Sequence, residues 1–292
     1  MILEITEDGS YIYRDHDTLL IKTKDKKIAI PAKKIDSINI TSNAKISTSA
    51  IMLCLQNEIN LVISNRNGYP EGRLWSSTLG KNAEIRRKQY INYDTDIGLK
   101  IANKIVKLKL EGEYRLAYNI WKNRRELRSK IELYLKRLNN LLNKLKYNKY
   151  NKSTLLGIEG SAANSYFSIL KLAIPKKFGF EQRDQIAKDP INASLNYLYG
   201  MCYREIESCI IISGLDPNYG FYHASQYGKP VLSFDLIEVF RSELDRLLLY
   251  LISKKRIKQD FFIKDESGLI SLEKEARKML INEYYSKLSK HV

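Results

Sequence analysis

The hydrophobic pattern of this chain changes period once, and that change constrains the fold more than any other feature. Over residues 1–78, apolar residues come in short runs broken by turn formers, as in "TLLIKTKDKKIAIP" and "NLVISNRNGYPEGRLW". From about residue 83 onward, they recur three and four positions apart with Lys and Arg between them, as in "IGLKIANKIVKLKLEGEYRLAYNIW". The first pattern is typical of strands and the second of amphipathic helices.

We therefore expect an α+β chain of two domains. The prediction is a small, mostly antiparallel β domain over residues 1–78 that includes one helix, a linker over 79–90, and a larger all-α domain over 91–292. The linker falls where the Ser, Thr, Gly and Asn of "SSTLGKNAEI" interrupt the apolar pattern. In the helical part, one helix is expected to start at "SAANSYFSILKLAI", and another to run from Asp189 to Gly214.

The chain is strongly basic. Its 49 Lys and Arg against 33 Asp and Glu give a formal net charge of +16, a field that attracts polyanions. Nucleic acid is the first candidate, with anionic membranes and acidic proteins behind it, and a surface that only aids solubility is the alternative. No run of about 18 apolar residues predicts a membrane span, and the start of the chain lacks the apolar core of a signal peptide. We expect a cytoplasmic protein that does not bind membranes.

Several common enzyme classes lack support. The sequence holds no GxxxxGK[ST], no GxGxxG after a strand and no GxSxG. ATP hydrolysis, Rossmann cofactor use and α/β-hydrolase chemistry are therefore not indicated.

One carboxylate stands among small and apolar residues in "LLGIEGSAANSYFSIL". Glu159 lies between Gly157 and Gly160, which we expect to let the backbone bend or approach another element. A buried, unpaired charge is costly, so this acid needs a partner. A divalent cation and an Arg or Lys side chain satisfy that need equally well.

A histidine and two further acids follow later in the chain. His223 lies in the loop "GLDPNYGFYH", and Asp235 and Glu238 follow it by 12 and 15 residues at the start of a predicted helix. The two acids are three apart, so they share a helix face. This face is either the solvated side of an amphipathic helix or a functional one that the loop folds back on. Two or three carboxylates and one imidazole suit Mg²⁺ or Mn²⁺, and zinc is less favoured because no Cys or His cluster is present.

Four ordered segments carry a resemblance to a known family: "GIEGSAANSYF", "DPINASLNYLYG", "GLDPNYGFYH" and "LSFDLIEVFR". They resemble the signature segments of the CRISPR-associated endonuclease/integrase that acts in spacer acquisition. The "GYPEG" hairpin and the C-terminal "DFFIKDESGLISLEKEARKMLI" are also similar to that family, so the resemblance spans essentially the whole chain.

The resemblance implies a β domain followed by a helical domain with one metal site. It implies a homodimer that associates with a small second adaptation protein. It implies a metal-dependent DNA endonuclease/integrase that inserts short duplex DNA into a CRISPR array, with each DNA 3′-hydroxyl attacking a phosphodiester. Members of the family also cleave double-stranded and branched DNA with Mg²⁺ or Mn²⁺.

Position by position, the resemblance implies the following roles. Glu159, His223 and Glu238 match metal ligands of the family. Asp235 matches a nearby catalytic acid that supports the site rather than binding metal directly.

Two further positions are candidate DNA contacts. Asn192 in "INA" resembles a motif position near the site, and Lys229, between the His223 loop and the acids, is placed to meet a phosphate. The alternative to the enzyme is a non-catalytic, basic nucleic-acid-binding scaffold whose acids only form salt bridges. The two interpretations differ over whether the three predicted ligands converge on a cation.

Overall fold

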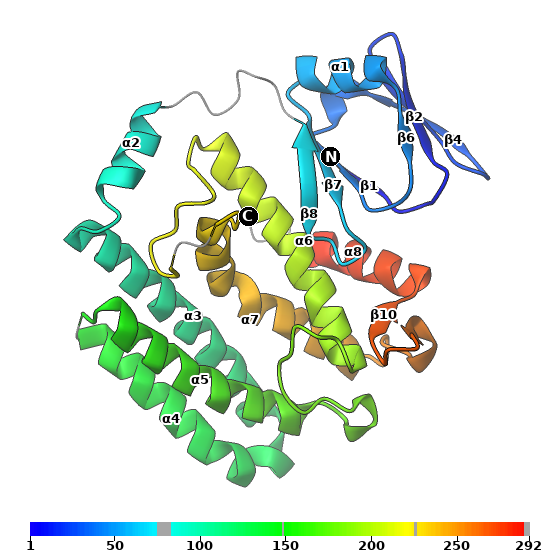
Figure 1. Cartoon of the computed structure of the whole chain (residues 1–292). Coiled ribbons are helices and arrows are strands. Elements are labelled where there is room, and N and C mark those ends of the chain that lie inside the picture. The colour runs from blue at the N-terminus through cyan, green and yellow to red at the C-terminus, as the bar shows by residue number, and fades with distance from the viewer. Residues whose placement is uncertain (75–82, 148, 225–226, 289–292) are drawn as a thin grey trace. The chain divides into compact units, whose positions relative to one another are not determined.

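The computed structural model describes residues 1–74, 83–147, 149–224 and 227–288 (Figure 1). The chain forms two compact units. The first comprises Met1–Ile85 and Tyr203–Leu215, and the second comprises Arg86–Cys202 and Asp216–Val292.

The first unit is built on two four-stranded sheets. One has the order β1-β5-β7-β8, with strands Ile2–Ile5, Ser37–Ile40, Asn60–Ser64 and Pro70–Leu74. The other has the order β4-β3-β2-β6, with strands Lys27–Pro31, Thr18–Lys22, Tyr11–Asp15 and Lys45–Ile46. Inward-facing residues of both sheets, among them Ile12, Leu19 and Ile38, are fully buried. The alternation of the sequence therefore produces the expected β core.

Strand pairing in this unit is mixed, which corrects the expectation of a mostly antiparallel domain. β1–β5, β5–β7 and β2–β6 run parallel, whereas β2–β3, β3–β4 and β7–β8 are antiparallel. Parallel pairs require crossover connections. One of them, from β5 to β7, contains helix α1 (Thr48–Gln56), whose N-cap Ser47 accepts a hydrogen bond from the backbone of Ala50. Hydrophobic alternation predicts strands but does not specify their partners.

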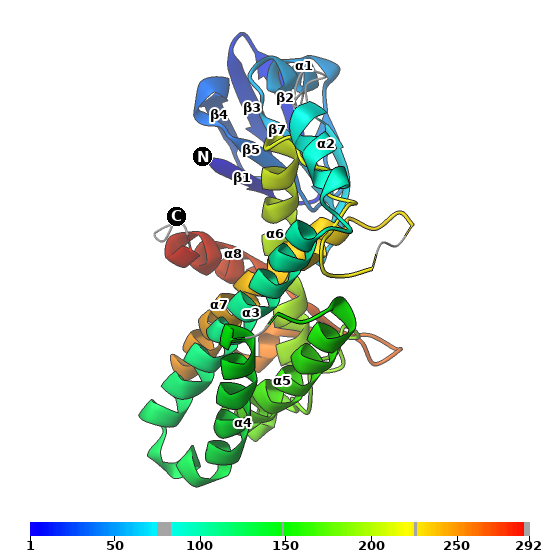
Figure 2. The same cartoon turned by 90° about the vertical axis from the view of Figure 1, so that its left-hand side faces the viewer.

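The second unit is dominated by long helices. Helices α3 (Asp96–Asn123), α4 (Arg128–Tyr147) and α5 (Lys152–Ala173) lie side by side, and α7 (Val231–Ser253) packs on α3 (Figures 1 and 2). The other helices among the described residues are α2 (Ala83–Ile91) and α6 (Pro190–Ile212), each of which has residues in both units, and α8 (Lys274–Leu288). Short 3₁₀ turns lie at Ala32–Lys34 in the first unit and at Arg125–Leu127, Lys176–Phe178 and Gln259–Phe261 in the second. No helix among the described residues has the length and apolarity that a membrane crossing needs.

A short hairpin near the C-terminus corrects the expectation of an all-α domain. Strands β9 (Phe262–Lys264) and β10 (Ile270–Leu272) pair antiparallel. Asp265 organises the turn by accepting a hydrogen bond from the backbone N–H of Leu269, and Gly268 supplies a positive φ of 84°.

The predicted linker overlaps a helix. Residues 79–82 lie outside the described residues, and residues 83–90 fall within α2. The predicted ends of α6 are observed, because the Asp189 carboxylate caps the N–H groups of Ile191 and Asn192 and Gly214 follows the helix with a positive φ. The domain limits at 78 and 91 stay a prediction.

Candidate metal centre

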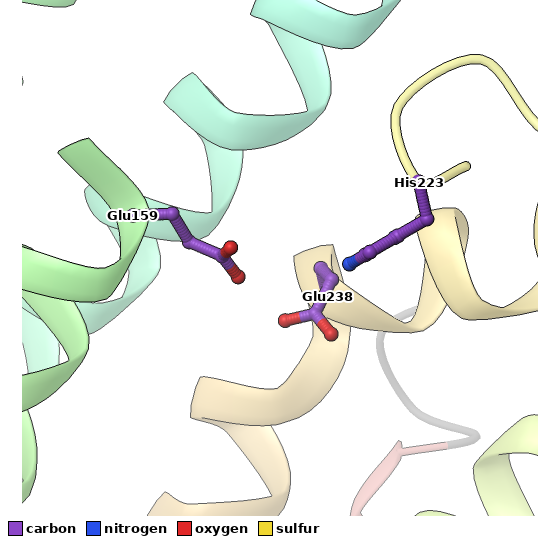
Figure 3. A group of neighbouring side chains, drawn as sticks. All are labelled: Glu159, His223 and Glu238. Atoms are coloured by element: carbon purple, nitrogen blue, oxygen red, sulfur yellow. The ribbon is translucent and has the colours of Figure 1, made fainter. Parts of the chain in front are cut away.

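Three elements of the helical unit bring Glu159, His223 and Glu238 together (Figure 3). Glu159 comes from α5, His223 from the loop before α7, and Glu238 from the second turn of α7. One ligand atom from each lies within 4.8 Å of the others, and the three side chains point toward one another. The predicted convergence of these residues is therefore present.

Glu159 sits inside a regular helix, which corrects the expected backbone bend. Helix α5 begins at Lys152, nine residues before the predicted start, because Asn151 caps it by accepting a hydrogen bond from the Thr154 N–H at 2.9 Å. A Cβ added at Gly157 or Gly160 would meet no atom within 4 Å. The two glycines are thus not required for a close approach.

Asp235 organises the loop that carries His223. Its buried carboxylate accepts three successive backbone N–H groups, those of Phe221 at 2.5 Å, Tyr222 at 2.8 Å and His223 at 2.9 Å. It also accepts a hydrogen bond from Nδ1 of the His223 ring at 2.8 Å. The ring is thereby fixed in one orientation, with Nε2 left to bind a ligand. This geometry fits a supporting acid rather than a direct metal ligand.

Gly220 makes this arrangement sterically possible. A Cβ at this position would lie 2.7 Å from Asp235 Oδ2 and 2.7 Å from Val231 Cγ1. The loop therefore needs a glycine where it crosses the start of α7.

Sequence reasoning missed Lys109, which projects from α3 into the centre. Its ammonium pairs with Glu159 Oε1 and lies 2.6 Å from Glu238 Oε2. The second contact is ionic without hydrogen-bond geometry, because Glu238 Oε2 has no hydrogen-bond partner within the described chain. Sequence reasoning also missed Tyr222, whose hydroxyl donates to Glu159 Oε2 at 2.7 Å.

A signal for Lys109 exists in the sequence. The buried stripe of α3 includes Ala102, Ile105 and Leu116, and both Lys109 and Glu113 fall on it. A Lys and a Glu four apart on an otherwise apolar helix face indicate a buried ionic function, since lone charges are rarely buried.

Burial and charge set the proton affinities of the centre. Burial raises the pKa of Glu159, but the charge of Lys109 and hydrogen bonds from Lys109 and Tyr222 outweigh it, so the pKa lies below its usual value. Burial lowers the pKa of His223, but its hydrogen bond to Asp235 and the charge of that acid outweigh it, so the pKa lies above its usual value. Both shifts favour the charged forms, an ionised Glu159 carboxylate and a protonated His223 ring.

The polar stripe of α7 is buried, which contradicts the alternative of a solvated helix face. Asp235, Glu238, Ser242 and Asp245 are each at most 4% exposed. Asp245 accepts hydrogen bonds from the hydroxyls of two buried tyrosines, Tyr166 at 2.6 Å and Tyr199 at 2.5 Å. Phe240 of the same helix, although apolar, is 48% exposed. The acidic and hydroxyl side chains of α7 therefore face the protein interior, whereas not every apolar side chain of this helix does.

The two candidate DNA contacts differ in setting. Asn192 is 1% exposed, and its amide bonds only with its own protein, through Arg183, Gln182, Asp184 and Asp189. This arrangement favours a role in holding the segment before α6. Lys229 is exposed in the loop between His223 and α7. DNA contact by either residue stays a prediction.

The donor set fits a hard divalent cation. Two carboxylates and one imidazole nitrogen are the ligand types that Mg²⁺ and Mn²⁺ accept, and the oxygen of Glu238 without a hydrogen bond can serve as one donor. The site thus has the features of a carboxylate–imidazole metal centre in a helical scaffold.

Comparison with known proteins identifies the family to which the chain belongs. The model of the family described as CRISPR associated protein Cas1 matches residues 3–286. The chain is 31% identical to the CRISPR-associated endonuclease Cas1 1 of Archaeoglobus fulgidus, over 96% of this chain and 86% of that protein. It is 30% identical to the CRISPR-associated endonuclease Cas1 1 of Thermodesulfovibrio yellowstonii, over 90% of this chain and 84% of that protein. The chain belongs to the Cas1 family.

Solved structures agree in fold. A Cas1 protein from Thermotoga maritima matches with a TM-score of 0.82 at 21% identity, over 100% of this chain and 91% of that one. A casposase bound to integration product matches with a TM-score of 0.81 at 24% identity, over 98% and 82%. A Cas6-RT-Cas1–Cas2 complex matches with a TM-score of 0.83 at 25% identity, over 98% of this chain and 32% of that chain. The two-part α+β fold class is thereby confirmed.

Proposed function

We propose that this chain is a metal-dependent DNA endonuclease/integrase that inserts short DNA fragments into a CRISPR array. The convergence of Glu159, His223 and Glu238 in a chain that matches the Cas1 family over residues 3–286 carries this proposal. The reaction is a transesterification, in which a DNA 3′-hydroxyl forms the new phosphodiester and the cleaved strand leaves with its own 3′-hydroxyl. Attack by water in the same site gives the nuclease activity.

Each residue of the centre has a defined task in this proposal. Glu159 and Glu238 would hold Mg²⁺ or Mn²⁺ through carboxylate oxygens, and His223 would hold it through Nε2. When bound, such an ion polarises the phosphodiester and orients the attacking group. Asp235 keeps the His223 ring in its binding orientation, and Tyr222 does the same for Glu159. The pre-set side chains lower the entropic cost of assembling the site.

The proposed partners follow the matched structures. The casposase structure contains an integration product, and another contains Cas1 with Cas2. We therefore infer that this chain binds double-stranded and branched DNA, forms a homodimer and joins a small second adaptation protein. The net charge of +16 supports polyanion binding. A cytoplasmic location fits a protein that acts on the DNA of the cell.

One observation favours the alternative of a non-catalytic scaffold. Lys109 pairs with both Glu159 and Glu238, so the two carboxylates are compensated without a metal ion. In this interpretation the centre is a buried salt-bridge cluster, and the basic surface alone binds nucleic acid.

Strand transfer separates the two functions. A labelled short duplex is incubated with supercoiled plasmid and Mn²⁺, Mg²⁺ or EDTA, with the second adaptation protein present. The variants are Glu159→Gln and the matched control Glu132→Gln, an exposed glutamate of α4. We expect joining that requires metal, survives in the control and is lost in Glu159→Gln while gel-shift binding persists. Binding without joining or nicking in any metal would favour the scaffold.

A further inference from the structure

Lys109 occupies a position that a metal-binding centre would be expected to keep free of cations. The residue is 7% exposed, and its ammonium reaches both carboxylates proposed as ligands. Ionised carboxylates in a buried site are costly without a cation nearby. In the structure, Lys109 provides that compensation for Glu159. For Glu238 it shares the task with Arg241, whose Nη2 lies 3.0 Å from Glu238 Oε1.

The ammonium and a divalent cation compete for the same oxygens. A carboxylate oxygen bound to a metal has fewer lone pairs for an ammonium, and two cations at this spacing repel each other strongly in a site of low dielectric constant. Metal binding therefore requires Lys109 to give up at least one of its pairs.

A second acceptor for Lys109 lies on its own helix. Glu113 is four residues further along α3, so the two side chains share a face. Glu113 is 4% exposed, and within the described residues its Oε2 has no hydrogen-bond partner. The acid is thus buried, within reach of Lys109 and incompletely paired.

Close packing of α3 against α7 places this acceptor beside the centre. A Cβ at Gly112 would lie 2.3 Å from Ser242 Oγ, so the two helices approach at a glycine directly before Glu113. Ser242 follows Glu238 by one helical turn on the same face of α7. Glu113 therefore lies beside the centre, near enough for its charge and that of Lys109 to influence each other.

We propose that Lys109 is an internal cation of the metal-free centre and that it moves from Glu159 and Glu238 to Glu113 when a divalent cation binds. This inference rests on the proposed metal site. It gives Glu113 a function that the ligand set does not explain. Metal affinity then depends on how well Lys109 is held before and after the exchange.

Metal affinity of four variants tests the exchange. Mn²⁺ binding to the full chain without DNA is measured at pH 8.5 by titration calorimetry, and free Mn²⁺ is followed by electron paramagnetic resonance. Burial raises the pKa of Glu113 to about 8, so at this pH its carboxyl can ionise and receive the ammonium. The variants are Lys109→Met, Glu113→Gln, the double variant, and the control Lys107→Met on the same helix. We expect binding about tenfold tighter in Lys109→Met, because no ammonium has to be displaced, which corresponds to about 1.4 kcal/mol.

Glu113→Gln has the opposite expected effect. The displaced ammonium then has no carboxylate to join, so Mn²⁺ binding should weaken about tenfold. The same substitution in the Lys109→Met background should change the affinity little, and Lys107→Met should match the wild-type protein. Circular dichroism checks the fold of each variant, and if Lys109→Met does not fold, the affinity of Glu113→Gln decides.

Two results would overturn the exchange. One is a Lys109→Met protein that binds Mn²⁺ no more tightly than wild type. The other is a Glu113→Gln substitution that leaves the Mn²⁺ affinity unchanged, or that changes it equally in the wild-type and Lys109→Met backgrounds. An equal change would mean that the charge of Glu113 acts on the metal directly and not through Lys109. Glu159→Gln and Glu238→Gln test the site itself. If neither reduces Mn²⁺ binding to the wild-type chain, the proposed metal site fails, independently of Lys109.

Discussion

At the scale of single residues, the side chain with the most hydrogen bonds at the centre is Asp235, an acid that is not one of the three proposed ligands. Asp235 accepts three backbone N–H groups and the His223 ring, so it shapes the loop and the imidazole together. A carboxylate suits this task because it only accepts hydrogen bonds. An amide in its place would turn an NH₂ group toward an N–H donor.

Replacement of this acid should weaken metal binding without removing a ligand. We expect Asp235→Asn to reduce Mn²⁺ affinity about 10- to 100-fold, the usual range for residues that orient metal ligands. Calorimetric titration measures the affinity, and Asp260→Asn, on an exposed aspartate of the same unit, is the control. Equal affinities in Asp235→Asn and wild type would show that His223 is oriented by other contacts.

Glu113 leads to a prediction about pH. Burial raises the pKa of Glu113 from 4.5 to about 8, opposed by the charge of Lys109 and reinforced by Glu238, Asp245 and Glu159. Because the folded protein binds this proton more tightly than the unfolded chain, protonation of Glu113 stabilises the fold. This stabilisation is complete below the unfolded pKa. It is then lost as the pH rises through the folded value. The metal-free protein should lose stability between about pH 4.5 and 8 through this group.

Glu113→Gln should remove that loss, because the amide does not ionise. We expect the variant to melt close to wild type at pH 5 and a few degrees above it at pH 8.5, since about 1 kcal/mol shifts Tm by roughly 2–4 °C in a chain of this size. Thermal melts in EDTA at both pH values provide the measurement. A melting difference that does not grow with pH would mean that Glu113 stays ionised in the folded protein.

At the scale of secondary-structure elements, α2 holds the loop that leads to His223. Gln89 is 4% exposed, and its side-chain amide donates to the carbonyls of Asp216 and Tyr219 at 2.9 and 2.7 Å. Its carbonyl accepts the Asp216 N–H at 2.8 Å. One side chain therefore closes three backbone hydrogen bonds of a segment without regular secondary structure. The helix that overlaps the predicted linker thus supports the site.

Loss of this clamp should loosen the loop. A single hydrogen bond contributes about 0.5–1.5 kcal/mol, so we expect Gln89→Ala to speed amide exchange in the 214–223 segment by roughly tenfold or more. Hydrogen exchange with mass spectrometry resolves the segment, and Ile91→Ala, an exposed residue of the same helix, is the control. Unchanged exchange would show that the loop is held by Asp235 alone.

The sequence predicts elements best where local chemistry marks their ends. Helix α6 runs as expected because Asp189 and Gly214 define its limits, and α7 begins at Val231, so Asp235 and Glu238 lie near its start as predicted. Helix α5 begins nine residues before its predicted start, because Gly157 and Gly160 weaken the helical pattern whereas the Asn151 side chain caps the helix upstream of them. The resemblance of four ordered motifs predicts three converging residues. Lys109 lies outside those motifs on a distant helix, and only packing places it among them.

At the scale of the whole molecule, the sequence order does not divide the chain into two halves. The first unit includes Tyr203–Leu215, the end of α6 and the turn after it. Within that unit, Arg73 pairs with Glu207 at 2.5 Å and the buried Arg204 pairs with Glu4 at 2.6 Å. Hydrophobic period alone assigns α6 to the helical part, because ion pairs between distant segments leave no periodic signal. The β unit therefore depends on residues far along the chain.

Net charge is also a property of the whole chain, and it leads to the last prediction. A net charge of +16 implies that DNA binding releases counterions, so affinity should fall steeply with salt. A protein that contacts roughly 6–10 phosphates loses about 10³–10⁵ in affinity between 50 and 200 mM salt. Fluorescence anisotropy with a labelled duplex in EDTA gives the slope of log affinity against log salt.

The same titration tests Lys229, the exposed lysine of the loop between His223 and α7. If Lys229 meets a phosphate, Lys229→Gln should weaken binding to every duplex sequence to a similar extent and reduce the salt slope by about 1. The matched control is Lys136→Gln, an exposed lysine of α4 that pairs with Glu132. An unchanged slope for Lys229→Gln would remove this residue from the DNA contact. A reduced slope for both variants would assign DNA binding to the diffuse field of the chain, because a field produced by many lysines responds to each of them.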